Sequence, residues 1–347
     1  MARVVDLFCG IGGLTSGLRT AGLNVVAGVD IDSKCQYAFE ANNNALFISK
    51  SIKDVTGDEI NELYDDDPVR ILVGCAPCQP FSNHQKNKYD RKMHKDWGLL
   101  NDFLRIVTDT MPMIVSMENV PTLLKESIFD DFVEGLRNLG YSVKYEVHNT
   151  FDYGMAQRRY RLLLLASLLG DIDFVDDKEE GRTVRDVIGH LPSVSMGIPD
   201  QNDRYHVSSL LSDLNLRRIQ SSLPGGTWED WDPNLLPDCY KKESGKTYKS
   251  VYGRMDYDSI APTLTTQFHS YGTGRFGHPV QNRAITVREG AILQSFPENY
   301  VFLPPHEKVQ VSVLSRQIGN AVPPRLGLHI GRSIIRHLND NGINYND

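Results

Sequence analysis

The sequence predicts an α/β fold: a doubly wound, mostly parallel sheet with a smaller loop-rich subdomain. Three observations lead to this prediction. Apolar runs of strand length alternate with stretches of helical period through the first half of the chain. A glycine-rich turn follows the first apolar run. After about residue 180 the long periodic runs end, and Gly, Pro, Ser, Tyr and Trp become frequent.

The first part of the predicted sheet has the form of a nucleotide-binding unit. Residues 2–8 read as a buried strand, 9–13 as a glycine-rich turn, and 14–21 as a helix closed by Gly22. The next strand, 24–29, leads to Asp30, where a carboxylate can accept hydrogen bonds from ribose hydroxyls. Thr15 stands where a dinucleotide fingerprint has its third glycine, which favours a cofactor with ribose but no pyrophosphate, such as S-adenosylmethionine. A plain glycine turn is the alternative.

The alternation of strands and helices continues to residue 167. Further strands are predicted at 47–55, 69–73, 113–117, 142–147 and 161–167. Helices are predicted at 34–42, 99–107, 129–139, 183–191, 286–293 and 325–338. Asp54, near the end of the third strand, is a candidate partner for an adenine amino group. Pro324 precedes the last helix, where proline is pre-organised for helix entry.

The segment 74–82 carries the candidate nucleophile. Pro77 stiffens the backbone before Cys78, and a cysteine held at the carboxyl edge of a sheet is a candidate for covalent catalysis. A redox pair or half of a zinc site are alternatives for Cys75-x-x-Cys78, but no second pair of ligands follows at zinc spacing, so no metal is expected. We interpret Cys75 as a buried structural cysteine. The polar segment 82–97 predicts a mobile lid, with a disordered surface loop as the alternative.

Other charged residues are predicted to lie at strand ends. Glu118 follows the strand 113–117, so Glu118 and Cys78 are predicted to project into one cleft. A charge at a helix N-terminus is the alternative. Arg159 and Arg161 enter the last strand two residues apart, so we expect them on one face, suited to an anion or to a carbonyl that gains charge. Solvated surface charge is the alternative there.

The composition leaves room for a nucleic-acid partner. The 347 residues carry a net charge of −7, but binding phosphate requires only a local cationic face. Between residues 192 and 278, basic and aromatic side chains are interleaved on irregular chain, which suits nucleic-acid contact or an interaction module. No apolar run is long enough to span a bilayer, and five scattered cysteines do not suggest a disulfide framework. We therefore expect a cytoplasmic protein with no membrane segment.

Taken in order, the motifs resemble those of the DNA (cytosine-5) methyltransferase family over almost the whole chain. They occupy residues 6–14, 77–79, 118–120, 157–161, 283–297 and 317–323. The chain resembles the compact bacterial enzymes of restriction–modification systems. The resemblance implies a Rossmann-like catalytic domain dependent on S-adenosylmethionine, at 1–185 and again at 283–347. It also implies a target-recognition domain at 186–282 that reads double-stranded DNA.

The resemblance implies a role for each matching residue. Cys78 would attack C6 of a flipped-out cytosine, and Glu118 would hold a proton at N3. Arg159 and Arg161 would steady the base and Glu118. The cofactor would be lined by Phe8, Gly10, Ile11, Gly12, Gly13, Leu14, Asp30, Ile31, Asp54, Val55, Pro77, Asn320 and Ala321. The DNA would be contacted by Gln79, Ser82, Asn119, Arg254, Thr265 and Arg275.

Three other functions remain open from the sequence. A transfer RNA cytosine methyltransferase would use the same core, but the large basic and aromatic insertion favours DNA. A catalytically silent DNA-binding relative is disfavoured by the presence of Cys78, Glu118, Arg159 and Arg161. A nicotinamide-dependent dehydrogenase is disfavoured by Thr15. We expect a monomer that forms no stable complex with any cognate restriction endonuclease.

Overall fold

The structure, a computed structural model, describes residues 2–77, 96–242 and 249–345. Contacts divide the chain into two compact units. Unit 1 comprises Met1–Tyr153, Tyr160–Lys178 and Ala321–Asp347, and unit 2 comprises Gly154–Arg159 and Glu179–Asn320. Residues 283–320 belong to unit 2, whereas the predicted return to the catalytic domain covered 283–347. The functional roles assigned to the domains stay predictions.

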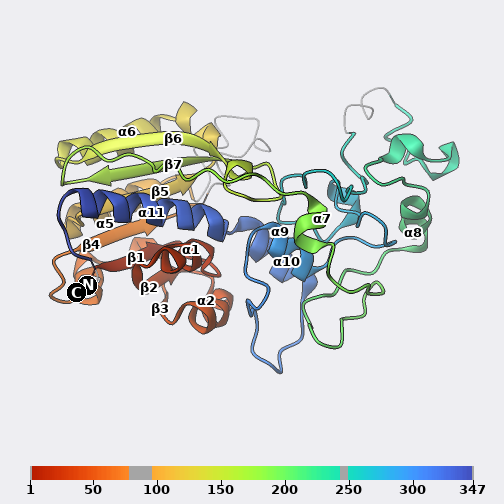
Figure 1. The fold of residues 1–347 in the computed structure, drawn as a ribbon, viewed down its shortest axis with the longest axis horizontal. Helices are drawn as coiled ribbons and strands as arrows, with labels where there is room; N and C mark the ends of the chain where they lie inside the picture. The colour runs from red at the N-terminus through yellow and green to blue at the C-terminus, as the bar shows by residue number, and fades with distance from the viewer. Residues whose placement is uncertain (1, 78–95, 243–248, 346–347) are drawn as a thin grey trace. The chain divides into compact units, whose positions relative to one another are not determined.

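In the described part of the chain, unit 1 is built on a seven-stranded sheet of order β3-β2-β1-β4-β5-β7-β6 (Figure 1). The strands are β1 (Arg3–Leu7), β2 (Asn24–Asp30), β3 (Leu46–Ser49), β4 (Arg70–Gly74), β5 (Ile114–Asn119), β6 (Ser142–Asn149) and β7 (Tyr160–Ser167). The first five pair in parallel, and β7 runs antiparallel to both of its neighbours. The predicted mostly parallel sheet is confirmed.

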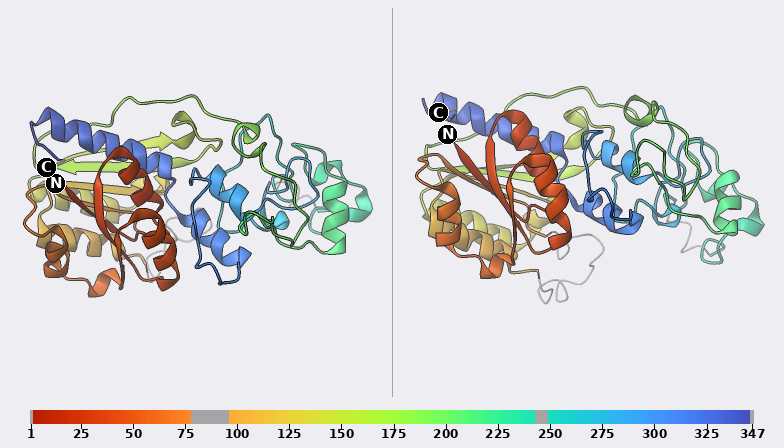
Figure 2. Two further views of the ribbon diagram at one scale, coloured as in Figure 1. Left: turned by 60° about the horizontal axis from the view of Figure 1, so that its bottom comes forward. Right: turned by 90° about the horizontal axis from the view of Figure 1, so that it is seen from below.

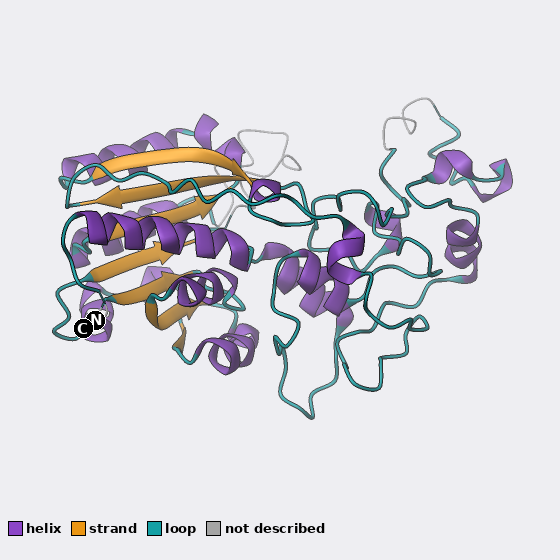
Figure 3. Ribbon diagram, in the orientation of Figure 1, coloured by secondary structure: helices purple, strands orange, loops and turns teal. Residues whose placement is uncertain are grey.

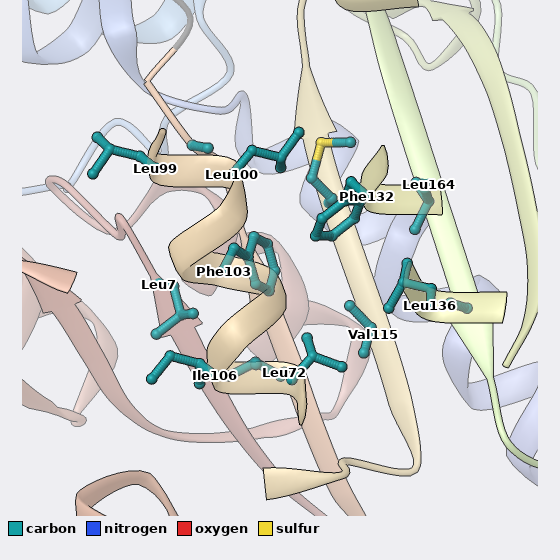
Figure 4. Packing of buried hydrophobic residues seen from close by; sticks show 14 of the residues in the cluster. Leu7, Leu72, Leu99, Leu100, Phe103, Ile106, Val115, Phe132, Leu136 and Leu164 are labelled. Atoms are coloured by element: carbon teal, nitrogen blue, oxygen red, sulfur yellow. The ribbon is translucent and has the colours of Figure 1, made fainter. Parts of the chain in front are cut away.

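Helices cover both faces of this sheet (Figure 3). One face packs against α3 (Gly57–Tyr64), α5 (Leu99–Thr110) and α6 (Ser127–Asn138). Figure 4 shows the centre of that layer, where Phe103 and Phe132 meet Leu72 and Val115 of the sheet. The opposite face packs against α1 (Gly13–Ala21) and α11 (Pro324–Asp340), while α2 (Gln36–Asn43) lies beside β3. Alternate strand residues therefore enter different layers, as the period of a strand requires.

Helices α1 and α11 approach so closely that only glycine fits between them. A Cβ added at Gly17 would lie 2.1 Å from the Pro324 carbonyl oxygen, and one at Gly327 would lie 2.7 Å from the Leu14 carbonyl oxygen. This contact holds α11 directly behind the helix that follows the glycine turn. The two chain ends also meet in unit 1, where the Ala2 amide donates to the Tyr345 carbonyl (Figure 2).

Unit 2 contains little regular structure. Its helices within the described ranges are α7 (Val184–Ile188), α8 (Asp213–Gln220), α9 (Val287–Leu293) and α10 (Val311–Asn320). Stacked rings fill one part of its interior, with Trp228 and Tyr240 parallel at 4.8 Å. The Arg218 guanidinium lies over the rings of Trp231 and Tyr252. The aromatic residues that suggested a binding surface therefore also serve as the core of a loop-rich subdomain.

The remaining short elements are 3-10 helices. They cover Ser33–Cys35, Ile52–Asp54, Pro121–Lys125, Thr150–Asp152, Trp228–Asp230, Pro233–Leu235 and Tyr271–Thr273. The predicted strand 47–55 was wrong in its second half, because β3 ends at Ser49 and Asp54 lies on a 3-10 turn. The prediction also missed α3, whose capping box joins Thr56 and Glu59 and was visible in the sequence. No helix in the described ranges is both long and apolar enough to cross a membrane.

A buried carboxyl group joins β1 to the start of α1. Asp6 is 1% exposed, and the Thr15 hydroxyl donates to its Oδ2 at 2.6 Å. Burial, with a smaller contribution from the charge of Asp30, raises the pKa of Asp6 to about 7, although the hydrogen bonds with Thr15 act in the opposite direction. Thr15, which replaces the third glycine of a dinucleotide fingerprint, therefore supplies the hydrogen bond that this carboxyl group needs.

We predict that Gly17→Ala destabilises unit 1. The new methyl group would overlap the Pro324 carbonyl oxygen, so α11 has to move away from α1. Overpacking of this kind costs about 1–3 kcal/mol and sometimes more. Thermal unfolding followed by circular dichroism should give a lower Tm. Gly98→Ala is the matched control, because an added Cβ at Gly98 meets no atom within 4 Å. Equal melting temperatures for the two variants would contradict the close helix contact.

We predict that Asp6→Asn changes how stability depends on pH. The folded-state pKa of about 7 lies above the ordinary aspartate pKa of 3.8, so between these values the folded protein binds a proton that the unfolded chain does not. The stability from this group is complete below about pH 4 and is lost as pH rises through 7. Asparagine does not titrate, so the Tm of the variant relative to wild type should rise across this window and then level off. The exposed Asp131→Asn variant should follow wild type in parallel, and a pH-independent difference for Asp6→Asn would refute the shifted pKa.

Candidate active site at the carboxyl edge of the sheet

The predicted site residues of unit 1 gather at one edge of the sheet because the strand register aligns them. Leu7, the last residue of β1, pairs with Val29 of β2 and with Gly74 of β4. Gly74 pairs in turn with Met117 of β5. The glycine turn after β1, the end of β2, the turn after β4 and Glu118 therefore lie next to one another. This edge is where open α/β sheets bind ligands.

The glycine turn is tied to the end of β2 by Asp30. The Gly10 amide donates to Asp30 Oδ2 at 2.9 Å, and the Asp32 amide donates to Oδ1 at 2.8 Å. Burial is the main cause that raises the pKa of Asp30 above its ordinary value. Each carboxylate oxygen keeps a second lone pair, so Asp30 can still accept a bond from a ribose hydroxyl. An added Cβ at Gly10 would meet no atom within 4 Å, so the space above the turn is open.

The residues predicted to hold the base and the ribose at this edge differ in polarity. Ile31 is 74% exposed directly after β2, although it is a large apolar residue. Phe8 has a positive φ of 60° and packs against Phe103. Asp54 is exposed on its 3-10 turn, while Val55 is buried beside it. An exposed apolar side chain and two carboxylates fit an adenosine group, whose base is flat and whose ribose carries hydroxyls.

One cationic residue that sequence reasoning missed fixes the turn carrying Asp54. Arg105 on α5 donates to the carbonyl oxygens of Ile52 and Val55, at 2.8 Å and 2.9 Å. No local sequence signal links position 105 to position 54, because the contact depends on how α5 packs beside the turn. Ile11 and Leu14, both predicted to line the cofactor, are buried, so their side chains belong to the core.

Glu118 is a deeply buried charged residue at this edge. It is 3% exposed, and Arg161 lies 2.8 Å from its Oε1 through Nε. The Cys75 thiol donates to its other oxygen, Oε2, at 2.7 Å. Cys75 is half-buried. Its interpretation as a buried structural cysteine missed this hydrogen bond to Glu118. Glu118 therefore has an ion pair at Oε1 and a hydrogen bond at Oε2, and together they favour one orientation of its carboxylate.

The turn that leads to the candidate nucleophile is also anchored. Asn119 is buried, and its side-chain amide donates to the Ala76 carbonyl oxygen at 3.0 Å. The predicted DNA contact of Asn119 gains no support from this placement, since the amide fixes the backbone before Pro77. Cys78, Gln79 and Ser82, which were predicted to act on the base and the DNA, lie outside the described residues, as does most of the predicted lid.

The two predicted active-site arginines have different surroundings. Arg161 lies on β7 in unit 1 and contacts Glu118, as predicted. Arg159 precedes the strand and belongs to unit 2, where its guanidinium donates to the carbonyl oxygens of Leu264 and Gly319. The two arginines were expected on one face of the last strand, but β7 begins at Tyr160, so Arg159 lies outside the strand. The contact of Arg159 with the base stays a prediction.

The other predicted ligand-binding residues lie in several environments. Arg254 is 3% exposed and donates to the carbonyl oxygens of Ile219, His278 and Gln281, so its placement does not support a DNA contact. Its pKa is lowered by burial. Thr265 is exposed and Arg275 half-buried, both in unit 2. The predicted cofactor residues Asn320 and Ala321 fall on either side of the boundary between the units.

Comparison with known proteins identifies the family. The family model for C-5 cytosine-specific DNA methylase matches residues 2–336. The chain is 50% identical over 344 residues to the Type II methylase M.HgiDII of Herpetosiphon aurantiacus, with 97% of this chain and 96% of that protein covered. It is 30% identical to the Type II methyltransferase M1.HphI of Haemophilus parahaemolyticus, over 96% of this chain and 86% of that protein.

The fold is also found among solved structures. A prophage-encoded protein from E. coli superposes with a TM-score of 0.75 at 23% identity, covering 98% of this chain and all of that one. This likeness and the seven-stranded sheet confirm the predicted Rossmann-like class of fold. The predicted resemblance is confirmed by the match across nearly the full length. The chain belongs to the C-5 cytosine-specific DNA methylase family.

Proposed function

We propose that this protein transfers a methyl group from S-adenosylmethionine to C5 of a flipped-out cytosine in double-stranded DNA. A temporary bond between Cys78 and C6 of the base would activate C5. One observation carries the proposal: the glycine turn, the anchored turn before Cys78 and the held carboxylate of Glu118 lie at one edge of one sheet. The names of the two Type II relatives support a further step, that the protein is the modification enzyme of a restriction–modification system.

The residues at this edge fit S-adenosylmethionine. Ile31 and Phe8 would contact the adenine, Asp30 would accept from the ribose, and Asp54 would accept from the adenine amino group. The open space at Gly10 would admit the amino-acid end of the cofactor near backbone amides. When bound, the cofactor supplies an electrophilic methyl group on a positively charged sulfur. Pro77, Asn320 and Ala321 remain predicted cofactor residues.

The chain's own residues would activate the base. The Cys78 thiolate adds to C6 while Glu118 supplies a proton to N3, so the ring becomes a neutral enamine whose C5 is nucleophilic. After C5 takes the methyl group, its proton passes to a water molecule acting as base. The C5–C6 double bond re-forms as the Cys78 thiolate leaves C6, and N3 returns its proton to Glu118. The base has to leave the duplex first, because C6 is covered by stacking. Gln79, Ser82, Thr265 and Arg275 are proposed to contact the DNA.

Arg161 and Cys75 would orient Glu118 in this reaction. Arg161 holds Oε1 and Cys75 holds Oε2, so the carboxyl group cannot rotate away from the position it needs at N3. A group fixed before the substrate arrives needs no reorganisation during the reaction. No step of this reaction is assigned to Arg159, because its guanidinium donates to two carbonyl oxygens of unit 2.

The test of the proposed function is base-resolution mapping of 5-methylcytosine in plasmid DNA from cells that express the protein. We expect methylation at one short sequence. Cys78→Ser should abolish it and leave DNA binding intact, because oxygen is a much weaker nucleophile at C6. The control is Cys239→Ser, which replaces an exposed cysteine of unit 2 and should leave methylation unchanged. A duplex with 5-fluorocytosine at the mapped site should trap wild-type protein covalently. Full methylation by Cys78→Ser, or no trapping, would refute the covalent route.

Removing the Cys75 thiol should slow methyl transfer without weakening substrate binding. In Cys75→Ala, Glu118 loses the bond at Oε2, and a hydrogen bond to a charged group contributes about 1.5–3 kcal/mol. We expect kcat to fall about tenfold or more while KM for DNA stays within about twofold. Cys75→Ser keeps a donor and should restore most of the rate. An unchanged kcat in Cys75→Ala would show that the thiol does not orient Glu118.

A further inference from the structure

A short strap in unit 2 holds one loop by its backbone. The strap is residues 154–159, and the loop it holds, the clamped loop, is residues 261–266. They meet as a parallel bridge between Gln157 and Ala261, and the Ala261 amide donates to the Ala156 carbonyl at 2.8 Å. The Thr263 hydroxyl donates to the Arg158 carbonyl, also at 2.8 Å. More than one hundred residues of sequence separate the two segments, so the contact is purely tertiary.

Two buried polar side chains of the strap satisfy the backbone of the clamped loop. The Leu264 amide donates to Gln157 Oε1 at 3.0 Å, and Arg159 donates to the Leu264 carbonyl oxygen at 2.9 Å. Gln157 is fully buried and Arg159 is 5% exposed. One residue of the loop therefore has both backbone polar groups bonded by strap side chains. Leaving either unpaired would be costly, because neither reaches water.

The same two side chains connect the clamped loop to the ends of α9 and α10. Gln157 donates to Gln294 at 2.8 Å and to the Leu293 carbonyl oxygen at 3.3 Å. Arg159 donates to the Gly319 carbonyl oxygen at 3.2 Å. A Cβ added at Gly319 would lie 2.5 Å from the Thr265 carbonyl oxygen, so α10 supports the loop from another side. The strap and α10 thus contact the clamped loop directly, and the strap is itself bonded to the end of α9.

The fixed backbone presents the Thr265 hydroxyl group to solvent. Leu264 is buried and Thr265 is exposed, and the Thr265 oxygen accepts from the Gln267 amide, so its own hydrogen can still be donated. A hydroxyl group on a fixed backbone suits the phosphate oxygens of a nucleic acid, where such contacts set the register of a protein on the duplex. The Arg159 guanidinium is directed at carbonyl oxygens inside unit 2, where it orders the loop.

We propose that Arg159 and Gln157 are positioning residues that hold the clamped loop in the conformation that contacts the DNA backbone. The identification of DNA as the partner rests on the proposed function. The claim that Arg159 and Gln157 order the clamped loop does not depend on it. It changes the role expected for Arg159 from a contact of the base to a support for a DNA-contacting loop. Arg159 then contributes to DNA affinity through order in the loop, without neutralising a phosphate.

The decisive variant is Arg159→Met, which keeps the length of the side chain and removes every donor. Hydrogen exchange followed by mass spectrometry should show faster exchange at the Ala261 and Leu264 amides, and no change in α5. Fluorescence anisotropy with a duplex carrying the mapped site should show DNA binding about tenfold weaker or more. The slope of log affinity against log salt should stay the same, because a lost phosphate contact would lower it by about 0.9. The affinity for S-adenosylhomocysteine, measured by calorimetry, should change less than twofold.

The matched control is Arg158→Met, which removes the same charge from the exposed neighbouring position. A loss of DNA affinity in Arg159→Met no larger than in Arg158→Met would overturn the proposal, as would unchanged amide exchange or a reduced salt slope.

A fall in kcat at saturating DNA, with affinity and exchange unchanged, would return Arg159 to the role of a base contact. If Arg159→Met does not fold, Thr263→Val is the second variant, because it removes the exposed hydrogen bond between the loop and the strap. We expect faster amide exchange at Leu264 in this variant. Unchanged exchange there would exclude the proposal. If wild-type protein binds no DNA, the proposed function fails while the exchange experiment still tests the strap.

Discussion

The pairing of Glu118 with Arg161 is the interaction on which the candidate site depends. Both charges are largely removed from water, so each needs the other to offset the cost of burial. Removing one partner of such a pair typically costs about 3–5 kcal/mol, because a buried charge is left alone. The pair exists only because β7 runs antiparallel to β5, which brings the start of β7 to the edge where the parallel strands end. The antiparallel direction of β7 therefore brings Arg161 next to Glu118.

The same edge is assembled from turns that are each fixed by a different partner. Asp30 holds the glycine turn, Asn119 holds the turn before Pro77, and Arg105 holds the turn that carries Asp54. Behind them, α11 packs on α1 through glycines at distances that no side chain allows. Such support is what a catalytic site requires, since small displacements of reacting groups are costly.

Unit 2 is also held together by buried polar side chains, although it has no sheet in the residues described. Its chain is mostly irregular, so its shape has to come from buried side chains that bond to backbone groups. Arg254, Gln157 and Arg159 all do so, and Arg283 pairs with Glu289 inside the same unit. Burial by itself would raise the pKa of Glu289, but the hydrogen bonds and the charge of Arg283 outweigh it and lower that pKa to about 2. Several basic residues that looked available for DNA therefore hold loops in place instead.

The sequence by itself determined the class of fold, most strands and helices of unit 1, and the motif order that identifies the family. These follow from local periodicity, glycine turns and spacing, which the chain carries without any tertiary contact. It did not determine that Asp54 lies on a 3-10 turn, that Cys75 bonds to Glu118, or that Arg159 and Arg161 serve separate units. Each of these depends on which distant segment packs beside the residue. A two-residue spacing predicts a shared strand face only within the strand, and the tertiary structure decided where that strand begins.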